Sequence, residues 1–237
     1  MSPAAGTLYG IGVGPGDPEL LTLKAARLLA DAPVIAYPAP LDGASMARTI
    51  AAPHIPEGRI EIAIRMPMVE ARFPAQEVYD RAGREIGAHL DAGRDVAVLC
   101  EGDPFFYGSF MYLFGRLAGA HRVVVVPGVS ALTATAAAAG APLAARNDVL
   151  TVLPGPLPED ALIERLARAE AVAIIKVGRH LAKVKRALEA TGLAAGAHYI
   201  SHASMPDQRV VPLAELETDK APYFSMILAH RRGEAWS

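Results

Sequence analysis

Cysteine is almost absent from the sequence, since Cys100 is the single one among 237 residues. An intramolecular disulfide is therefore excluded. Cys100 ends the apolar run 96–99, and with no second cysteine a buried strand residue is favoured over a nucleophile or a metal ligand. The seven histidines are scattered without the spacing of a metal site, so no metal is expected.

An excess of charge is also lacking, because 23 basic and 25 acidic side chains leave a net charge of −2. Such a chain has no overall attraction for nucleic acid, and an acidic ligand would need a local basic patch. No stretch approaches the roughly 18 uncharged apolar residues of a membrane span. The first 30 residues lack the basic start and apolar core of a signal peptide. We therefore expect a cytoplasmic protein with neither nucleic-acid nor membrane partners.

Apolar residues are plentiful, at 52% of the chain, which suffices for one large core or two modest ones. The first half alternates short apolar runs with helix-like segments, a pattern typical of a parallel sheet with crossover helices. The predicted strands are 7–13, 34–37, 60–66, 95–100 and 122–126, and the predicted helices are 19–30, 45–52, 78–90 and 110–118.

The sequence pattern changes after the valines 123–126, where Pro127-Gly128 favours a break in regular secondary structure. We predict an α/β fold with two domains, residues 1–126 and 127–237. The second half predicts helices at 131–139, 159–169 and 181–190 and strands at 150–153, 171–177, 199–201, 209–212 and 223–229. Its last strands lack helical crossovers, so a mixed sheet is expected there.

A glycine-rich loop, Gly10–Pro18, follows the first predicted strand and opens the first helix. A dinucleotide site is the obvious interpretation, but no G-x-G-x-x-G spacing fits the loop. A Walker-type phosphate loop is excluded, since no Gly-Lys-Ser or Gly-Lys-Thr closes it. Asp17 fits a helix cap better than a direct chemical role, with Pro18 at the first helical position.

Two more loops follow predicted strands, in the segments 100–109 and 127–131, and the second of these consists of small residues. Loops that leave the carboxyl ends of parallel strands are where ligands bind, so all three should converge. Phe105, Phe106 and Tyr107 in the second loop fit core packing and a site lining equally well. Together the loops indicate a ligand of nucleoside size between the domains.

The motifs Gly10–Asp17 with Leu21-Thr22, Gly102–Pro104 and Pro127–Ala131, in this order, resemble the tetrapyrrole methylase family across nearly the whole chain. Segments 100–113 and 34–39 are most similar to the branch that methylates precorrin-2 at C-20. The resemblance implies a homodimer, a tetrapyrrole substrate, and S-adenosylmethionine bound in the cleft between the domains, with S-adenosylhomocysteine as product.

The resemblance also assigns candidate residues by position. Cofactor contacts fall on Pro15, Glu101, Gly102, Asp103, Phe106, Ser130, Ala131, Val177, Ala203 and Met226. Val177 stands where many relatives have methionine, so its contact would use the backbone. The first glycine loop would border the tetrapyrrole, through Gly12, Gly14 and Gly16. Four arginines are candidates to bind the substrate carboxylates: Arg48, Arg65, Arg72 and Arg146. Each of them fits an ordinary exposed surface arginine as well.

The sequence shows no catalytic constellation, which is consistent with methyl transfer to an enamine-like carbon that is itself the nucleophile. Asp17 and Tyr107 are conceivable proton handlers, and no catalytic residue is assigned. Two rival functions are a nicotinamide-dependent oxidoreductase, which the glycine spacing argues against, and a non-catalytic tetrapyrrole carrier. The metal-free substrate and its cobalt-bearing counterpart both fit the sequence.

Overall fold

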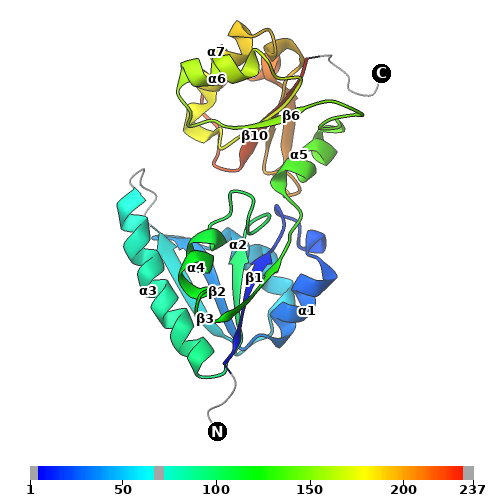
Figure 1. Cartoon of the computed structure of the whole chain (residues 1–237). Helices are drawn as coiled ribbons and strands as arrows, with labels where there is room; N and C mark the ends of the chain where they lie inside the picture. The colour runs from blue at the N-terminus through cyan, green and yellow to red at the C-terminus, as the bar shows by residue number, and fades with distance from the viewer. Residues whose placement is uncertain (1–4, 67–71, 232–237) are drawn as a thin grey trace. The chain divides into compact units, whose positions relative to one another are not determined.

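A computed structural model describes residues 5–66 and 72–231, with side chains for all of these except 72–75. The chain divides into two compact units, with the division between Ser130 and Ala131. Each unit contains one five-stranded sheet (Figure 1).

The first unit has a sheet in the order β3-β2-β4-β1-β5, with every pair of neighbouring strands parallel. Its strands are β1 (Thr7–Gly12), β2 (Val34–Pro40), β3 (Ile60–Met66), β4 (Val96–Cys100) and β5 (Arg122–Val126). Its helices are α1 (Leu23–Asp31), α2 (Met46–Ala51), α3 (Arg72–Asp91) and α4 (Phe110–Leu117).

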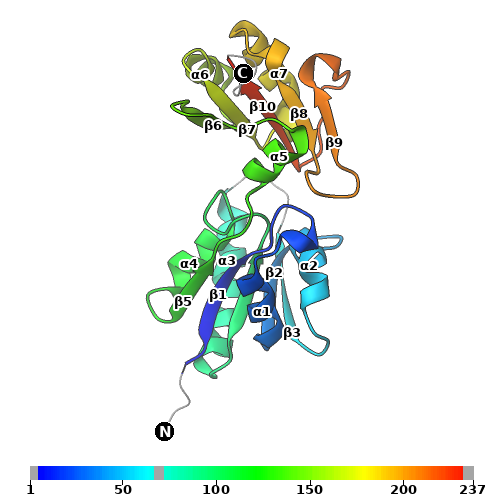
Figure 2. The same ribbon diagram turned by 90° about the vertical axis from the view of Figure 1, so that its right-hand side faces the viewer.

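Both faces of this sheet are covered at its centre, which explains why the central strand β4 is continuously apolar. Along the central strand β4, Val96 and Val98 pack in the cluster under α3 and α4, whereas Ala97 and Leu99 pack in the cluster under α1 and α2. Figures 1 and 2 show the two pairs of helices on opposite faces. The carboxyl ends of all five strands therefore lie at one edge of the unit, which is called the first loop edge below.

The second unit has a mixed sheet in the order β6-β7-β10-β8-β9. Only β6 and β7 are parallel, and the other neighbouring pairs are antiparallel. Its strands are β6 (Leu150–Pro154), β7 (Ala171–Ile175), β8 (His198–Ser201), β9 (Arg209–Pro212) and β10 (Ser225–His230). Its helices are α5 (Ala131–Ala139), α6 (Glu159–Leu166) and α7 (Leu181–Ala190). α6 and α7 cover one face of the sheet and α5 packs on the other.

These sheets confirm the predicted α/β class, with a parallel first sheet and a mixed second one. Several element boundaries differ by a few residues from the prediction, and two of these differences change the local structure of residues singled out in the sequence. The first helix begins at Leu23, because Leu21 is extended and Thr22 caps the helix by accepting the Ala25 N–H at 3.1 Å. Asp17 does act as a cap, but of the short 3-10 turn Pro18–Leu20 that precedes this helix.

Strand β7 also ends at Ile175, two residues before the predicted end. Lys176 has φ of +55°, and this left-handed conformation turns the chain out of the strand. Val177 is consequently the N-cap of a 3-10 turn rather than a strand residue.

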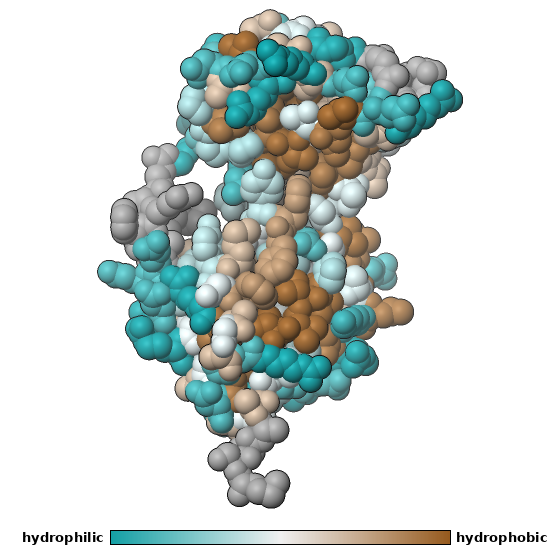
Figure 3. Space-filling model, viewed as in Figure 1, coloured by the Kyte–Doolittle hydropathy of each residue, from teal (hydrophilic) through white to brown (hydrophobic). Residues whose placement is uncertain are grey.

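The surface has an ordinary mixture of hydrophilic and hydrophobic side chains, as Figure 3 shows for one face. Large exposed apolar side chains include Leu23, Leu41, Phe105, Tyr112 and Tyr223. Within the part of the chain that the structure describes, no helix combines the length and the apolar character needed to span a membrane.

Candidate functional site

Three loops meet at the first loop edge through their glycines. Gly14 and Gly102 pair as an isolated antiparallel bridge, in which Gly102 N donates to Gly14 O at 2.8 Å and Gly14 N to Gly102 O at 3.3 Å. A Cβ on Gly12 would lie 2.6 Å from both Gly102 O and Gly128 N. These four residues are called the glycine junction, and only glycine at position 12 allows the three loops to come so close.

Asp103 fastens two of these loops together. Its Oδ1 accepts the backbone N–H groups of Phe105 and Phe106, at 2.9 and 3.2 Å, and its Oδ2 accepts the Gly128 N–H at 3.1 Å. The carboxylate therefore shapes the loops that follow β4 and β5. A ligand contact by Asp103 would have to use its backbone or a remaining lone pair.

Glu101 is the first residue after the central strand β4, and it is partly exposed. Burial raises the pKa of its carboxyl, while hydrogen bonds from its own backbone N–H and from that of Ala47 on α2 act in the opposite direction. The structure therefore places a carboxyl group with a raised pKa at the first loop edge.

The aromatic residues of the second loop are not core residues. Phe105, Phe106 and Tyr107 are 49%, 37% and 45% exposed, respectively. Phe105 makes an edge contact with Phe114 on α4, and Phe106 makes one with Tyr107. Of the two roles that the sequence leaves open, exposure argues against packing in the core.

The structure brings most of the first unit's predicted residues to the first loop edge. Gly12, Gly14 and Pro15 are buried there, and Gly16 and Phe106 are more accessible. Gly14 has φ of +80° and Gly102 has φ of +65°, which are conformations that favour glycine. Ser130 ends the first unit, and Ala131 begins α5 in the second.

The four predicted arginines lie in different surroundings. Arg48 donates to both carboxylate oxygens of Glu61, at 2.8–3.2 Å, so much of its charge is neutralised. Arg65 donates from Nη1 to the carbonyl oxygens of Pro40 and Leu41, at 2.9 and 3.1 Å, beside the end of β2. The side chain of Arg72 lies outside the described residues. Arg146 is exposed in a turn before β6, with φ of +50°.

The second unit has a loop edge of its own, which carries the other predicted contacts. The register pairs Ser225 with Ser201 and Ile227 with Ile174, so the start of β10 lies beside the ends of β7 and β8. Val177 and Ala203 follow those strand ends, and Met226 is the second residue of β10. Val177 and Met226 are buried, whereas Ala203 is partly exposed.

Backbone outliers cluster beside the predicted cofactor residues. Five non-glycine residues in the described ranges have positive φ, namely Tyr107, Arg146, Lys176, His202 and Ser204. Tyr107 follows Phe106, Lys176 precedes Val177, and His202 and Ser204 flank Ala203. Such conformations cost about 1–3 kcal/mol each and concentrate at functional sites. This clustering was not visible in the sequence, because none of these residue types signals a left-handed conformation.

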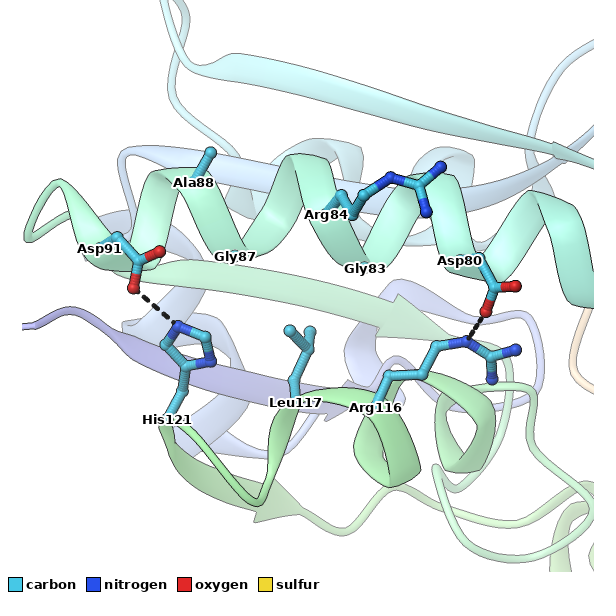
Figure 4. Close-up of a pocket in the computed structure, with 9 residues that line it drawn as sticks. All are labelled: Asp80, Gly83, Arg84, Gly87, Ala88, Asp91, Arg116, Leu117 and His121. Atoms are coloured by element: carbon cyan, nitrogen blue, oxygen red, sulfur yellow. Dashed lines mark hydrogen bonds and ion pairs between the residues drawn. The ribbon is translucent and has the colours of Figure 1, made fainter.

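A groove of about 460 Å³ lies between α3 and α4, and it is not the predicted site. Figure 4 shows it lined by an ion pair between Asp80 and Arg116, at 2.7 Å, and by a hydrogen bond between Asp91 and His121, at 3.0 Å. None of the predicted residues line it. Among the described residues, no group of three or more His, Cys, Asp and Glu side chains is arranged to hold a metal ion.

Comparison with known proteins identifies the family. The model of the tetrapyrrole (corrin/porphyrin) methylases matches residues 7–217. A precorrin-2 C(20)-methyltransferase from Sinorhizobium sp is 42% identical over 231 residues, which cover 94% of each chain. The cobalamin biosynthesis protein CobIJ of Mycobacterium tuberculosis H37Rv is 44% identical over 95% of this chain, but this chain spans only about half (46%) of that relative.

Solved structures show the same architecture. The uroporphyrin-III C-methyl transferase of Thermus thermophilus, complexed with S-adenyl homocysteine, aligns with a TM-score of 0.69 and 26% identity. The alignment covers 95% of this chain and 92% of that one. The motifs, the two sheets and these matches together confirm the resemblance found in the sequence: the chain belongs to the tetrapyrrole (corrin/porphyrin) methylase family.

Proposed function

We propose that this protein transfers a methyl group from S-adenosylmethionine to C-20 of precorrin-2, giving precorrin-3A in cobalamin biosynthesis. The Sinorhizobium relative, which carries this activity in its name, supports the proposal because it matches this chain over 94% of both lengths. The structural relative solved with S-adenyl homocysteine supports the choice of cofactor.

The proposed cofactor contacts are those predicted from the sequence, on the loop edges of both units. The observation that carries this assignment is the set of strained residues beside them, Tyr107, Lys176, His202 and Ser204. Folding maintains such strain only where the surroundings enforce it, which fits loops shaped to receive a ligand. The glycine junction fits the same role, since absent side chains leave backbone atoms open to close approach.

Bound S-adenosylmethionine supplies an activated methyl group whose leaving group is a neutral thioether. The protein's task is then mostly orientation. Holding the methyl and the substrate carbon about 3 Å apart and in line can contribute several kcal/mol to the lowering of the barrier. The close approach of the Gly12, Gly102 and Gly128 backbones supports this role, because closely packed loops have little room to shift.

Among the proposed substrate arginines, Arg65 is the strongest candidate. Its Nη1 is fixed by the carbonyls of Pro40 and Leu41, and it forms no ion pair among the described residues. Its other N–H groups can therefore meet a carboxylate of the substrate. Arg48 is weaker, because Glu61 already neutralises it through two hydrogen-bonded oxygens.

Incubation with precorrin-2 and S-adenosylmethionine without oxygen tests the proposal by mass spectrometry of the product. We expect the addition of one methyl group. Cobalt-precorrin-2 offered in parallel tests the alternative substrate, and faster methylation of it would move the assignment to the cobalt-bearing branch. Bound nicotinamide in the purified protein would favour an oxidoreductase, and tight binding of precorrin-2 without turnover would favour a carrier. A homodimer remains a prediction that light scattering can check.

A further inference from the structure

The loop of residues 202–208 joins β8 to β9 at the loop edge of the second unit. These two strands are antiparallel neighbours (Figure 2), so the chain must reverse its direction between them. It does so through two consecutive turns, in which Met205 N donates to His202 O at 2.9 Å and Gln208 N donates to Met205 O at 3.0 Å. The shape of these turns therefore fixes where Ala203, a proposed cofactor contact, lies.

Two residues of this loop have a backbone conformation that their own side chains do not favour. His202 has φ of +50° and Ser204 has φ of +66°, and the two flank Ala203. Residues other than glycine leave this left-handed region unless contacts elsewhere hold them in it. The position of Ala203 therefore depends on the groups that hold its two neighbours.

Side chains at the end of the loop supply such contacts. Gln208 Oε1 accepts the Ser204 N–H at 2.7 Å, and Asp207 Oδ2 lies 3.0 Å from His202 Nδ1. His202 is also held through its backbone, because its N–H donates to Phe224 O at 2.8 Å. Gln208 itself is exposed, so its side chain adds little to a core, and the hydrogen bond across the loop is its main contribution.

We propose that Gln208 is a positioning residue for S-adenosylmethionine, because it holds the turn around Ala203 through the Ser204 N–H. This inference rests on the proposed function and on the contact proposed for Ala203. A ligand binds only the fraction of molecules whose loop has the competent shape, so its apparent affinity falls in proportion to that fraction. Gln208 raises this fraction, since its hydrogen bond stabilises the strained conformation of Ser204.

Gln208→Ala tests the proposal by removing the acceptor of the Ser204 N–H. In a calorimetric titration, the dissociation constant for S-adenosylmethionine should rise about three- to tenfold, the loss expected for one hydrogen bond. In methyl transfer to precorrin-2, the KM for S-adenosylmethionine should rise by a similar factor. The kcat should stay within about twofold of the wild type, because the bound cofactor itself holds the loop once the site is filled.

Gln208→Glu separates the hydrogen bond from the rest of the side chain. A carboxylate oxygen can accept the Ser204 N–H as the amide oxygen does, so the cofactor affinity should stay within about twofold of the wild type. Hydrogen exchange of the Ser204 amide in the free protein reports the contact directly, and it should be faster in Gln208→Ala than in the wild type and Gln208→Glu. Glu164→Ala, the control at an exposed position of α6, should change neither the affinity nor this exchange.

Three outcomes would overturn the proposal. Wild-type cofactor affinity in Gln208→Ala would show that the loop keeps its shape without this side chain. An equal loss of affinity in Gln208→Glu would show that the acceptor of the Ser204 N–H is not what matters. A fall in kcat with unchanged affinity would place the role of Gln208 outside cofactor binding. A wild-type protein that binds S-adenosylmethionine but leaves precorrin-2 unmethylated would refute the proposed function alone, whereas one that does not bind S-adenosylmethionine would refute both.

Discussion

Replacing Gly12 with alanine should break the glycine junction. The added Cβ would lie 2.6 Å from Gly102 O and from Gly128 N, closer than real Cβ atoms come to such neighbours. Both neighbours are backbone atoms, so relief requires one of the three loops to move. Overpacking in a well-packed site costs about 1–3 kcal/mol, and a rigid backbone neighbour places Gly12→Ala at the upper end, about 3 kcal/mol.

Thermal melting and methyl-transfer kinetics measure the effect. At about 2–4 °C per kcal/mol for a chain of this size, the melting temperature of Gly12→Ala should fall by about 6–12 °C. Its kcat/KM for precorrin-2 should fall as well, because the loops lose their arrangement. Gly115→Ala on α4 is the matched control, with no atom within 4 Å of the new Cβ. Alanine should stabilise that helix by about 0.5–1 kcal/mol. If Gly12→Ala melts and reacts like the wild type, the loops do not pack as described.

Three further predictions concern other parts of the chain. Gly102→Val should lose cofactor binding in a calorimetric titration. The control Gly58→Val also places a side chain at a positive φ, of +79°, and should keep cofactor binding. Equal cofactor affinities of the two variants would argue against the site. The hydrogen bond from Arg48 lowers the pKa of Glu61, so the wild type should have a higher melting temperature than Glu61→Gln above pH of about 4.3. This difference should vanish as the pH falls through the lowered pKa of Glu61 in the folded protein, and a difference that persists in acid would contradict the prediction. Arg231 donates to the carbonyl oxygens of Leu166 at 2.9 Å and Ala169 at 3.1 Å, so Arg231→Ala should cost about 1 kcal/mol in urea unfolding, and no loss would show that water replaces it.

The secondary structure of this chain could be predicted closely from the sequence because its signals are local. Strands such as β4 are unbroken apolar runs between turn residues, and α7 has apolar residues at helical spacing. The end of β7 could not be predicted, because the left-handed conformation of Lys176 depends on packing around it rather than on its own preference.

The candidate site could be predicted only as a set of loops. Glycines at strand ends indicated where loops converge, and the structure shows Gly14 and Gly102 hydrogen-bonded. The partners of charged side chains were beyond the sequence. Nothing in the spacing of Arg48 and Glu61 reveals their ion pair, and nothing near Asp103 reveals the hydrogen bond that it accepts from the Gly128 N–H. Such contacts join residues from different elements, whose side-chain directions depend on the folded backbone.

The position of the transferred methyl group tests the central claim most directly. The protein should be incubated without oxygen with precorrin-2 and S-adenosylmethionine that carries a ¹³C-labelled methyl group, and the product should be examined by NMR. We predict one labelled methyl, bonded to the C-20 meso carbon. A label on any other carbon, or an unlabelled tetrapyrrole recovered with intact S-adenosylmethionine, would contradict the proposed activity.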